Sequence, residues 1–453
     1  MQWSTLFSEA RPGDKEPRRA TEDRTNFERD FDRVVFSSAF RRLQDKTQVI
    51  PLPDNDFVHT RLTHSLEVSC VGRSLGKMVG KTIIERYQLT DLHPSDFGAV
   101  VATAALAHDI GNPPFGHSGE AAISDYFING NGQRFREQIA DDALWQDLVS
   151  FEGNANGFRL LTNYNEATGG SISLTYSTLA AFTKYPTQSL KLLETKRGSQ
   201  KKYGYFQADK DIFASIFKHL EIDQIPGTDY AWLRHPLAFL VEAADDICYR
   251  IIDFEDGMRM RLIGAAEGTA LLKAVAGKYF SEERYNSIKG EREQWGYLRA
   301  VSISRLITET VQAFLDNEAK MLTGEFDKPL LDVFPTDLQN DLNQIIKLSV
   351  KHIYRSRTVL EIEAAGFNVV AELLDLFINA TIDKHTYGDK LRKQKPYSEK
   401  ILSILPEQFL FDGQPHGRDL YLRILRICEF VAGMTDTYAV SIYRKLKGIE
   451  LPK

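Results

Sequence analysis

Residues 104–120 read AALAHDIGNPPFGHSGE, and the pattern around this stretch decides the expected fold. Apolar residues recur every three or four positions before His108, at Phe97, Val101 and Ala104. This period predicts a helix that begins near Pro94 and carries His108 on its apolar face. The glycine and prolines of residues 111–114 then end the helix. His108 and Asp109 are therefore expected at the end of a buried helix, where a carboxylate needs a compensating cation.

Two further helices carry candidate metal ligands. His64 is followed at helical spacing by apolar residues, so it also lies on an apolar face: Val68, Val71 and Leu75. A helix expected over residues 236–254 carries Asp245 at the edge of its apolar face and Asp246 nearly opposite. Asp245 is the better candidate ligand and Asp246 suits a solvated or supporting role. The pattern alone leaves the choice between these two aspartates open.

Together, His64, His108, Asp109 and Asp245 offer two imidazoles and two carboxylates, a plausible complete shell for one divalent metal ion. A mixed nitrogen and oxygen donor set suits Mn, Fe or Ni, or Mg with retained waters. Such an ion can polarise a phosphoryl oxygen and activate water. Metal-assisted phosphate ester hydrolysis is therefore the first hypothesis. Either histidine alone would more often be an ordinary core residue, and the adjacent Asp109 shifts the balance towards a metal.

Two pairs near these ligands are candidates for chemistry or substrate binding. His117 and Glu120 are three residues apart, so one helical turn places the carboxylate beside the imidazole, where it can orient the ring. The alternative is a helix-start pair, since a glutamate suits the first turn. Tyr249 and Asp253 follow Asp245 at four and eight residues and can line the same cleft. The alternative for these two is an ordinary polar helix flank.

Composition and motifs exclude several function classes. The 453 residues are 43% hydrophobic and 26% charged, and the net charge of -6 gives no whole-protein reason to expect nucleic acid or membrane binding. The three cysteines are far apart, which favours a reducing cytoplasmic compartment. We expect no signal peptide and no apolar run long enough to span a bilayer. Phosphate-loop, dinucleotide-binding and nucleophile-elbow motifs are absent from the sequence.

The predicted fold class is mostly α, with a short β-hairpin or two. We expect a mobile N-terminal arm over residues 1–25, because RPGDKEPRR breaks any helix. A catalytic core is expected over residues 26–260 with an insertion around 125–235, followed by a helical region over 261–453 that packs on the core. Turn residues in ATGGSIS and TKRGSQKKYGYF predict a hairpin within residues 165–210. A further loop or hairpin is expected at FLFDGQPHG, and helices are expected at 297–322, 336–383 and about 418–446.

Several longer strings resemble a known family. They are FRRLQDKTQV (40–49), TRLTHSLEVSCVGR (60–73), AHDIGNPPFGHSGE (107–120), FEGNANGFRLL (151–161), KKYGYF (201–206), EAADDICYRIIDFEDG (242–257) and FVAGMTDTYA (430–439). The order of histidines and aspartates resembles the HD-domain metal-dependent phosphohydrolases. The longer strings are similar to the dGTPase family of deoxynucleoside triphosphate triphosphohydrolases within that superfamily, and the resemblance covers most of the chain. One departure is Asn156, where a glutamine is commoner.

The resemblance implies an HD-domain helical fold and a reaction, in which a dNTP and water give a deoxynucleoside and inorganic triphosphate. It implies that the four residues named above bind the metal and that His117 and Glu120 form a catalytic dyad. The implied substrate contacts are Gln48, Arg61, Asn112, Tyr249 and Asp253. Gln48 and Arg61 match positions that contact the sugar and the α-phosphate, and Tyr249 and Asp253 match residues that close over the deoxyribose. Further cations near a triphosphate are Lys201, Lys202 and Arg250.

The resemblance also implies cofactor and partners. One divalent metal per subunit is expected, Mn²⁺ or Mg²⁺ first and Fe, Ni or Co as alternatives, with dGTP as preferred substrate. A homo-oligomer, either hexamer or tetramer, is implied, with a nucleotide or single-stranded DNA as effector and with no membrane partner. Two alternatives stay open. One is an HD phosphohydrolase that acts on a nucleoside monophosphate or a signalling nucleotide. The other is a nucleotide- or nucleic-acid-sensing protein with a vestigial site.

Overall fold

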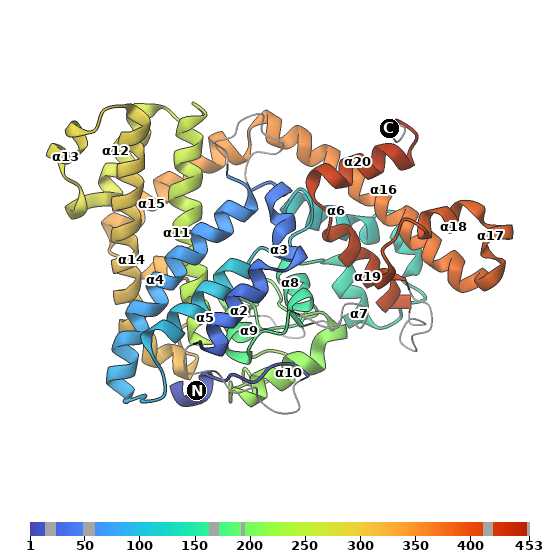
Figure 1. Ribbon diagram of the computed structural model, residues 1–453, viewed down its shortest axis with the longest axis horizontal. Helices are drawn as coiled ribbons and strands as arrows, with labels where there is room; N and C mark the ends of the chain where they lie inside the picture. Colours follow the sequence, from blue (N-terminus) through green and yellow to red (C-terminus); the bar gives the residue numbers. More distant parts are fainter. Residues whose placement is uncertain (14–23, 49–58, 163–171, 192–194, 411–419, 451–453) are drawn as a thin grey trace.

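The computed structural model describes residues 1–13, 24–48, 59–162, 172–191, 195–410 and 420–450, and it is almost entirely helical (Figure 1). The described residues contain no β-strand and only isolated bridges, which pair Thr47 with Thr60, Thr187 with Ala231 and Gln224 with Trp232. The expected mostly α fold class is therefore confirmed.

The helices of the N-terminal half follow one another closely along the chain. They are α1 (Trp3–Leu6), α2 (Asn26–Val35), α3 (Ser38–Arg42), α4 (Arg61–Tyr87), α5 (Pro94–Ala107), α6 (His117–Ile128), α7 (Asp142–Val149), α8 (Gly153–Thr162), α9 (Tyr176–Phe182), α10 (Lys210–His219) and α11 (Pro236–Arg259). The C-terminal half consists of α12 (Ala265–Ala276), α13 (Glu282–Ser287), α14 (Glu291–Thr323), α15 (Thr336–Ser349), α16 (Arg357–Tyr387), α17 (Leu391–Gln394), α18 (Pro396–Leu402), α19 (Leu420–Ala432) and α20 (Asp436–Leu446).

Helices α4, α5 and α11 pack against one another at the centre. The candidate metal ligands come from the start of α4, the end of α5 and the middle of α11. Small residues allow α4 and α5 to approach closely. A β-carbon on Gly76 of α4 would lie 2.5 Å from the carbonyl oxygen of Phe97 on α5, so no larger residue fits there. The fully buried residues Val68, Val101 and Ile247 fill the space between the three helices, which fixes their relative positions.

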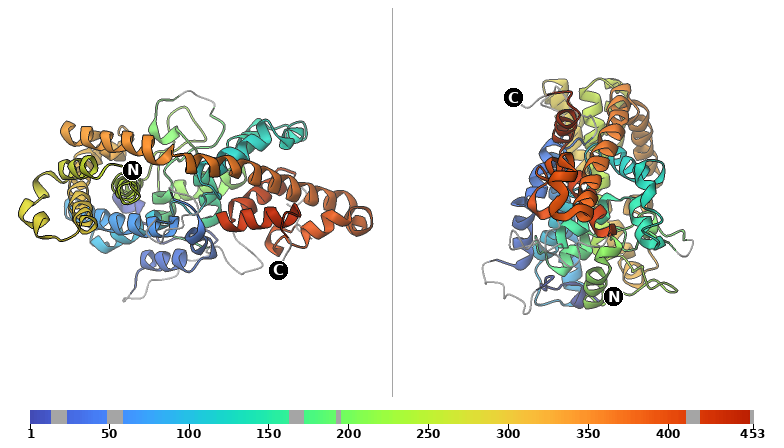
Figure 2. Two further views of the ribbon diagram at one scale, coloured as in Figure 1. Left: turned by 90° about the horizontal axis from the view of Figure 1, so that it is seen from above. Right: turned by 90° about the vertical axis from the view of Figure 1, so that its right-hand side faces the viewer.

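The C-terminal helices form two groups on opposite sides of this centre. Helices α12–α15 lie at one end of the elongated molecule and α17–α18 at the other, with α16 running along it between them (Figures 1 and 2). Helices α16 and α19 share a second hydrophobic cluster with α6, in which Ile123, Leu373 and Leu425 are fully buried. Helices α4, α5 and α11 thus have a packed group of C-terminal helices on each side.

Two helices predicted as continuous are interrupted. The helix expected over 336–383 is divided into α15 and α16 by a π-helical turn, Val350–Tyr354, after which the chain restarts at Arg357. The last predicted helix is divided into α19 and α20, and the Thr435 side chain caps the second one by accepting a hydrogen bond from the Tyr438 N–H. Helical periodicity spans both breaks, so the pattern could not reveal them.

The expected mobile arm over residues 1–25 is wrong for residues 1–13. Trp3 is only 2% exposed, and its indole Nε1 donates a hydrogen bond to Glu318 of α14 at 2.6 Å. The Trp3 ring also packs against Phe97 of α5, with 5.5 Å between ring centroids. Arg11 is buried and forms an ion pair with Asp30 of α2. The apolar WSTLF start therefore anchors the chain, and residues 14–23 lie outside the described part.

The hairpin predicted within residues 165–210 is also wrong for the described part of that segment. Residues 198–200 form a 3₁₀ turn, and the aromatic side chains that follow are buried in the core instead of alternating across a sheet: Tyr203, Tyr205 and Phe206. Residues 167–171 of ATGGSIS and most of FLFDGQPHG lie outside the described residues.

One helical segment of the described chain, Arg357–Gln394, is long and apolar enough to cross a membrane by length and composition alone, contrary to the sequence expectation. Half of its most apolar window is buried inside the protein. The fully buried residues Val370, Leu374 and Phe377 lie in the cluster shared with α19. Core packing therefore accounts for the hydropathy of this segment.

Replacing Trp3 by alanine should lower the free energy of unfolding by about 3–5 kcal/mol, because a large buried side chain is lost. A urea unfolding curve with near-ultraviolet detection measures the change. Ser4→Ala, at an exposed neighbouring position, serves as the control. Equal midpoints for the two variants would contradict a packed N-terminal segment.

Candidate functional site

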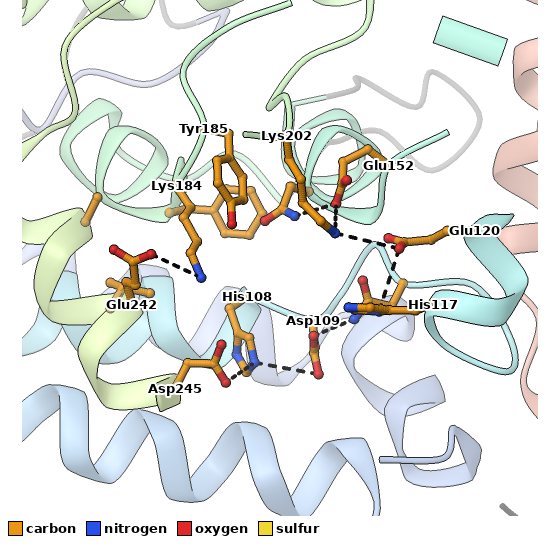
Figure 3. A pocket seen from close by; sticks show the side chains of 15 residues that line it. His108, Asp109, His117, Glu120, Glu152, Lys184, Tyr185, Lys202, Glu242 and Asp245 are labelled. Atoms are coloured by element: carbon orange, nitrogen blue, oxygen red, sulfur yellow. Dashed lines mark hydrogen bonds and ion pairs between the residues drawn. The ribbon is translucent and has the colours of Figure 1, made fainter. Parts of the chain in front are cut away.

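Four predicted ligands from three helices meet at one point. His64 lies in the first turn of α4, His108 caps the end of α5, Asp109 follows it, and Asp245 comes from α11. The Nε2 atoms of His64 and His108 lie 3.2 and 3.5 Å from Asp245 Oδ1, and His108 Nε2 lies 3.6 Å from Asp109 Oδ2. Figure 3 shows the His108 ring between the two carboxylates. Ligand atoms of His64, His108 and Asp109 lie within 4.8 Å of one another, which is close enough to hold a metal ion.

The hydrogen bonds of the two imidazoles favour a cation at this point. The His108 Nδ1–H donates to the carbonyl oxygen of Ala105 at 2.6 Å, so Nε2 carries the lone pair that faces the carboxylates. His64 Nδ1 is buried and finds no hydrogen-bond partner among the described residues, while its Nε2 faces Asp245. A buried cluster of lone pairs and carboxylates is stable only with a positive charge among them. The donor set present therefore fits a divalent metal ion.

Asp245 and Asp246 differ in their surroundings. Burial alone would raise the pKa of Asp245, but His108 and His64 lower it to about 2, so it remains ionised. Burial raises the pKa of Asp246 to about 7, and its nearest ion-pair partner is Arg250 at 3.9 Å. Asp245 is the carboxylate that faces both imidazoles, so it remains the better candidate ligand of the two.

Arg61 and Asn112 hold Asp109 in place. Arg61 Nη1 donates to Asp109 Oδ2 at 2.5 Å, and the Asn112 amide donates to Oδ1 at 2.5 Å. Burial opposes ionisation of Asp109, but Arg61 and then His108 hold the pKa of its carboxyl well below the usual range. Gly116 allows the close approach of this arginine, since a β-carbon there would lie 2.7 Å from Arg61 Nη2. Both predicted substrate contacts thus also orient a candidate ligand.

His117 and Glu120 face each other at the mouth of the cleft, with 3.7 Å between His117 Nδ1 and Glu120 Oε2. The His117 side chain is 80% exposed, whereas Glu120 is buried and accepts a hydrogen bond from the Gly153 N–H at 2.7 Å. Desolvation within the cleft, followed by the positive charge of Lys202, lowers the pKa of His117. The neutral imidazole is therefore favoured relative to an unperturbed histidine, and the ring is accessible.

Two cavities adjoin at the candidate metal group. The smaller, of about 180 Å³, is lined by basic and acidic side chains that include Lys184, Lys202 and Glu242. Figure 3 shows Lys184 and Lys202 on one side of this cavity and His108, Asp109 and Asp245 on the other. The larger, of about 490 Å³, is lined by aromatic and apolar side chains together with Gln48, Arg61 and Glu363. Three residues line both cavities: Asp109, His117 and Asp245.

The predicted sugar contacts occupy different positions. Tyr249 lines the larger cavity and stacks on Tyr354, with ring centroids 5.3 Å apart and an interplanar angle of 6°. Asp253 is only 1% exposed and lies behind this pair, where it accepts a hydrogen bond from the Tyr354 hydroxyl at 2.9 Å. Burial raises the pKa of Asp253 to about 7. Asp253 is therefore positioned to orient the tyrosine pair.

Sequence reasoning missed several cavity residues, of which Tyr354, Lys184 and Tyr185 are the most informative. Tyr354 belongs to the π-helical turn, which no periodicity reveals, although such turns are frequent at functional sites. Lys184 and Tyr185 come from an irregular segment after α9, and Lys184 Nζ lies 3.4 Å from Glu242 of α11. Of the basic residues suggested from the sequence, Lys202 lines the smaller cavity and Arg250 pairs with Asp246.

Comparisons with known proteins agree with this geometry. The HD domain family model matches residues 61–150, and the phosphohydrolase-associated domain model matches residues 333–445. A "deoxyguanosinetriphosphate triphosphohydrolase-like protein" of Synechocystis is 40% identical over 459 aligned positions that cover 100% of both chains. The chain belongs to this family of HD-domain proteins. It is therefore an enzyme, a hydrolase.

Other members of the family are also similar over most or all of the chain. A relative with the same name from Pseudomonas aeruginosa is 37% identical and also covers 100% of both chains. A protein of Klebsiella pneumoniae named "deoxyguanosinetriphosphate triphosphohydrolase" is 31% identical over 94% of each chain. The HD match includes His64, His108 and Asp109, whereas Asp245 lies beyond it and joins them only through the fold.

Replacing Asp245 by asparagine should weaken Mn²⁺ binding by at least about tenfold, because an ionised ligand is lost. Asp246→Asn is the matched control, and it should leave Mn²⁺ affinity near that of the unmodified protein. Isothermal titration of metal-free protein with MnCl₂ measures both. A larger loss in the Asp246 variant would assign the ligand role to that residue instead.

Proposed function

We propose that the protein hydrolyses deoxynucleoside triphosphates to deoxynucleoside and inorganic triphosphate by attack at the α-phosphate, with dGTP preferred. One observation carries the proposal. The candidate metal group lies at the boundary between a cavity with lysines and a cavity with stacked tyrosines. If the triphosphate occupies the first and the nucleoside the second, the bond between them lies at the metal group.

The smaller cavity suits a polyphosphate. Lys184 and Lys202 supply positive charge, and each is paired with carboxylates that a phosphate oxygen could replace as partner: Glu242 for Lys184, and Glu152 and Glu120 for Lys202. Burial opposes the charge of Lys184, but Glu242 raises the pKa of Lys184 above its usual value, so the ammonium is retained. Positioning and charge neutralisation are the main requirements of phosphoryl transfer.

The larger cavity suits a deoxynucleoside. The stacked Tyr249 and Tyr354 present an aromatic surface against which a deoxyribose can pack closely, which would exclude a ribose 2′-hydroxyl by contact. The Gln48 side-chain oxygen is buried and has no hydrogen-bond partner within the described residues, so it remains available to a sugar hydroxyl. Arg61, beside Asp109, can reach an α-phosphate at the boundary of the two cavities.

A bound divalent metal would polarise the α-phosphate and lower the pKa of a coordinated water. We propose Mn²⁺ or Mg²⁺ first, with Fe, Ni or Co as alternatives, held by His64, His108, Asp109 and Asp245. The neutral His117 accepts a proton at the mouth of the cleft, and the buried Glu120 orients its ring. The Gly153 N–H in turn holds Glu120 in place.

The wider biological setting rests on the family. We propose a homo-oligomer, hexamer or tetramer, that responds to a nucleotide or single-stranded DNA effector and has no membrane partner. We place the protein in the cytoplasm, consistent with its free cysteines Cys70, Cys248 and Cys428.

The proposed reaction predicts a specific product. Protein incubated with each dNTP and each rNTP in Mn²⁺, Mg²⁺ or EDTA should release deoxynucleoside and intact triphosphate from dNTPs only, fastest from dGTP and not at all in EDTA. Anion-exchange chromatography separates the products. Release of orthophosphate or pyrophosphate would instead indicate cleavage of another bond. Turnover of a nucleoside monophosphate would favour a different HD phosphohydrolase, and binding without turnover would favour a nucleotide sensor.

Replacing His117 by alanine should lower kcat by about 10²–10⁴-fold, the usual contribution of a general acid or base. Mn²⁺ affinity should be unchanged, because His117 lies outside the four-ligand group. His93→Ala, at the opposite end of α5, is the matched control and should keep full activity. Turnover that survives in the His117 variant would overturn the assigned role.

A further inference from the structure

The loop that joins Asp109 to His117 has an unfavourable backbone conformation. Two successive residues directly before His117 have positive φ: Phe115 with 63° and Gly116 with 60°. Glycine adopts positive φ readily, so the strain lies at Phe115. For a residue with a β-carbon, this backbone conformation is unfavourable by about 1–2 kcal/mol. Such a conformation persists only where surrounding contacts hold it. The contacts that hold this loop come largely from the C-terminal half of the chain.

The first contact is the carboxylate of Asp436, which is 1% exposed at the start of α20. Its Oδ1 accepts a hydrogen bond from the Phe115 N–H at 3.0 Å. Its Oδ2 accepts from the N–H and the hydroxyl of Thr47, at 2.9 and 2.5 Å. An aspartate in the first turn often serves its own helix, but here Thr435 caps α20. The Asp436 carboxylate therefore binds the loop at Phe115 and also Thr47, which precedes Gln48.

The second contact is the amino group of Lys46, which is 3% exposed and whose pKa is lowered to about 7 by burial. It donates to the carbonyl oxygen of Asn112 at 2.5 Å and to that of Ala432, at the end of α19, at 2.8 Å. Asn112 is the residue whose side chain holds Asp109. Lys46 therefore links the end of α19 to the loop between the candidate metal group and His117.

The third contact is made by the Phe115 side chain. It is buried in the cluster that includes α16, and it lies against Gly366. A β-carbon at Gly366 would approach the Phe115 ring to 2.8 Å, so the absence of a side chain at Gly366 leaves room for the ring. The backbone N–H and the side chain of this strained residue are thus both held by C-terminal helices.

We propose that Asp436 and Lys46 are positioning residues for the reaction. Through them α20 and α19, together with α16 against the Phe115 ring, complete the catalytic site by fixing His117. The catalytic part of this inference rests on the proposed function, while the structural part does not. If these contacts only stabilised the fold, their loss would lower the free energy of unfolding and leave kcat of the folded enzyme unchanged. A positioning role lowers kcat in protein that is fully folded.

The test is Asp436→Asn in the full chain. The amide offers one acceptor oxygen in place of two, so either the Phe115 or the Thr47 N–H loses its partner. We expect kcat for dGTP to fall by about tenfold to 100-fold, since a displacement of about 1 Å in a catalytic group has that effect. Mn²⁺ affinity should be unchanged, because no candidate ligand is altered. Asp383→Asn is the matched control: Asp383 of α16 accepts a hydrogen bond from Ser398 and should tolerate the same chemical change without loss of kcat.

Gly366→Ala keeps the inference testable if Asp436→Asn fails to fold. Alanine favours a helix over glycine, so α16 itself is not weakened, and only the Phe115 ring is displaced. We expect a similar fall in kcat with a cooperative unfolding curve. A folded Asp436 or Gly366 variant with kcat equal to that of the unmodified enzyme would overturn the proposal.

Amide hydrogen exchange separates this proposal from the proposed function. In Asp436→Asn, peptides that cover residues 109–120 should exchange faster than in the unmodified protein, whatever reaction the enzyme catalyses. If the unmodified protein hydrolyses no dNTP but the exchange changes as expected, the proposed function fails and the positioning contact stands. If dNTPs are hydrolysed and both exchange and kcat of the variant match the unmodified protein, the positioning role fails.

Discussion

The site depends on one electrostatic constraint, the burial of two carboxylates beside two imidazoles where three helices meet. Arg61 compensates Asp109, but Asp245 faces the Nε2 atoms of His64 and His108. A buried arrangement of this kind is costly unless a cation joins it. The close packing of α4, α5 and α11 encloses this polar cluster, so binding of the proposed metal ion would also stabilise the fold.

In the proposed function, the two cavities would divide the recognition of substrate between charge and shape. Lysines line the side that we assign to phosphate, where Coulomb attraction and hydrogen bonds provide affinity. Stacked tyrosines line the side assigned to the nucleoside, where contact and exclusion provide discrimination. Asp109, His117 and Asp245 line both cavities, and the proposed function would place the reacting bond beside them.

The phosphohydrolase-associated region is an integral part of the cleft. It supplies Tyr354 and Glu363 to the wall of the larger cavity. It also supplies Asp436 and Gly366, which contact the strained residue two positions before His117. An HD domain alone would lack these contacts, so the left-handed backbone at Phe115 and Gly116 would lose its support. The match of the relatives over the full chain is consistent with this dependence.

The sequence by itself determined the helical class and the three apolar helices, and it suggested which residues could bind a metal. Each of these follows from local periodicity and from the cost of placing His64, His108 or Asp245 on an apolar face. The predicted mobile arm was wrong for residues 1–13, because the burial of Trp3 depends on α5 and α14, which lie far away along the chain. Only the tertiary structure decided the stacking of Tyr354 on Tyr249, the entry of Lys184 into the cleft and the contact of Asp436 with Phe115. These pairs are separated by tens to hundreds of residues, and no local pattern encodes which distant side chains a fold brings together.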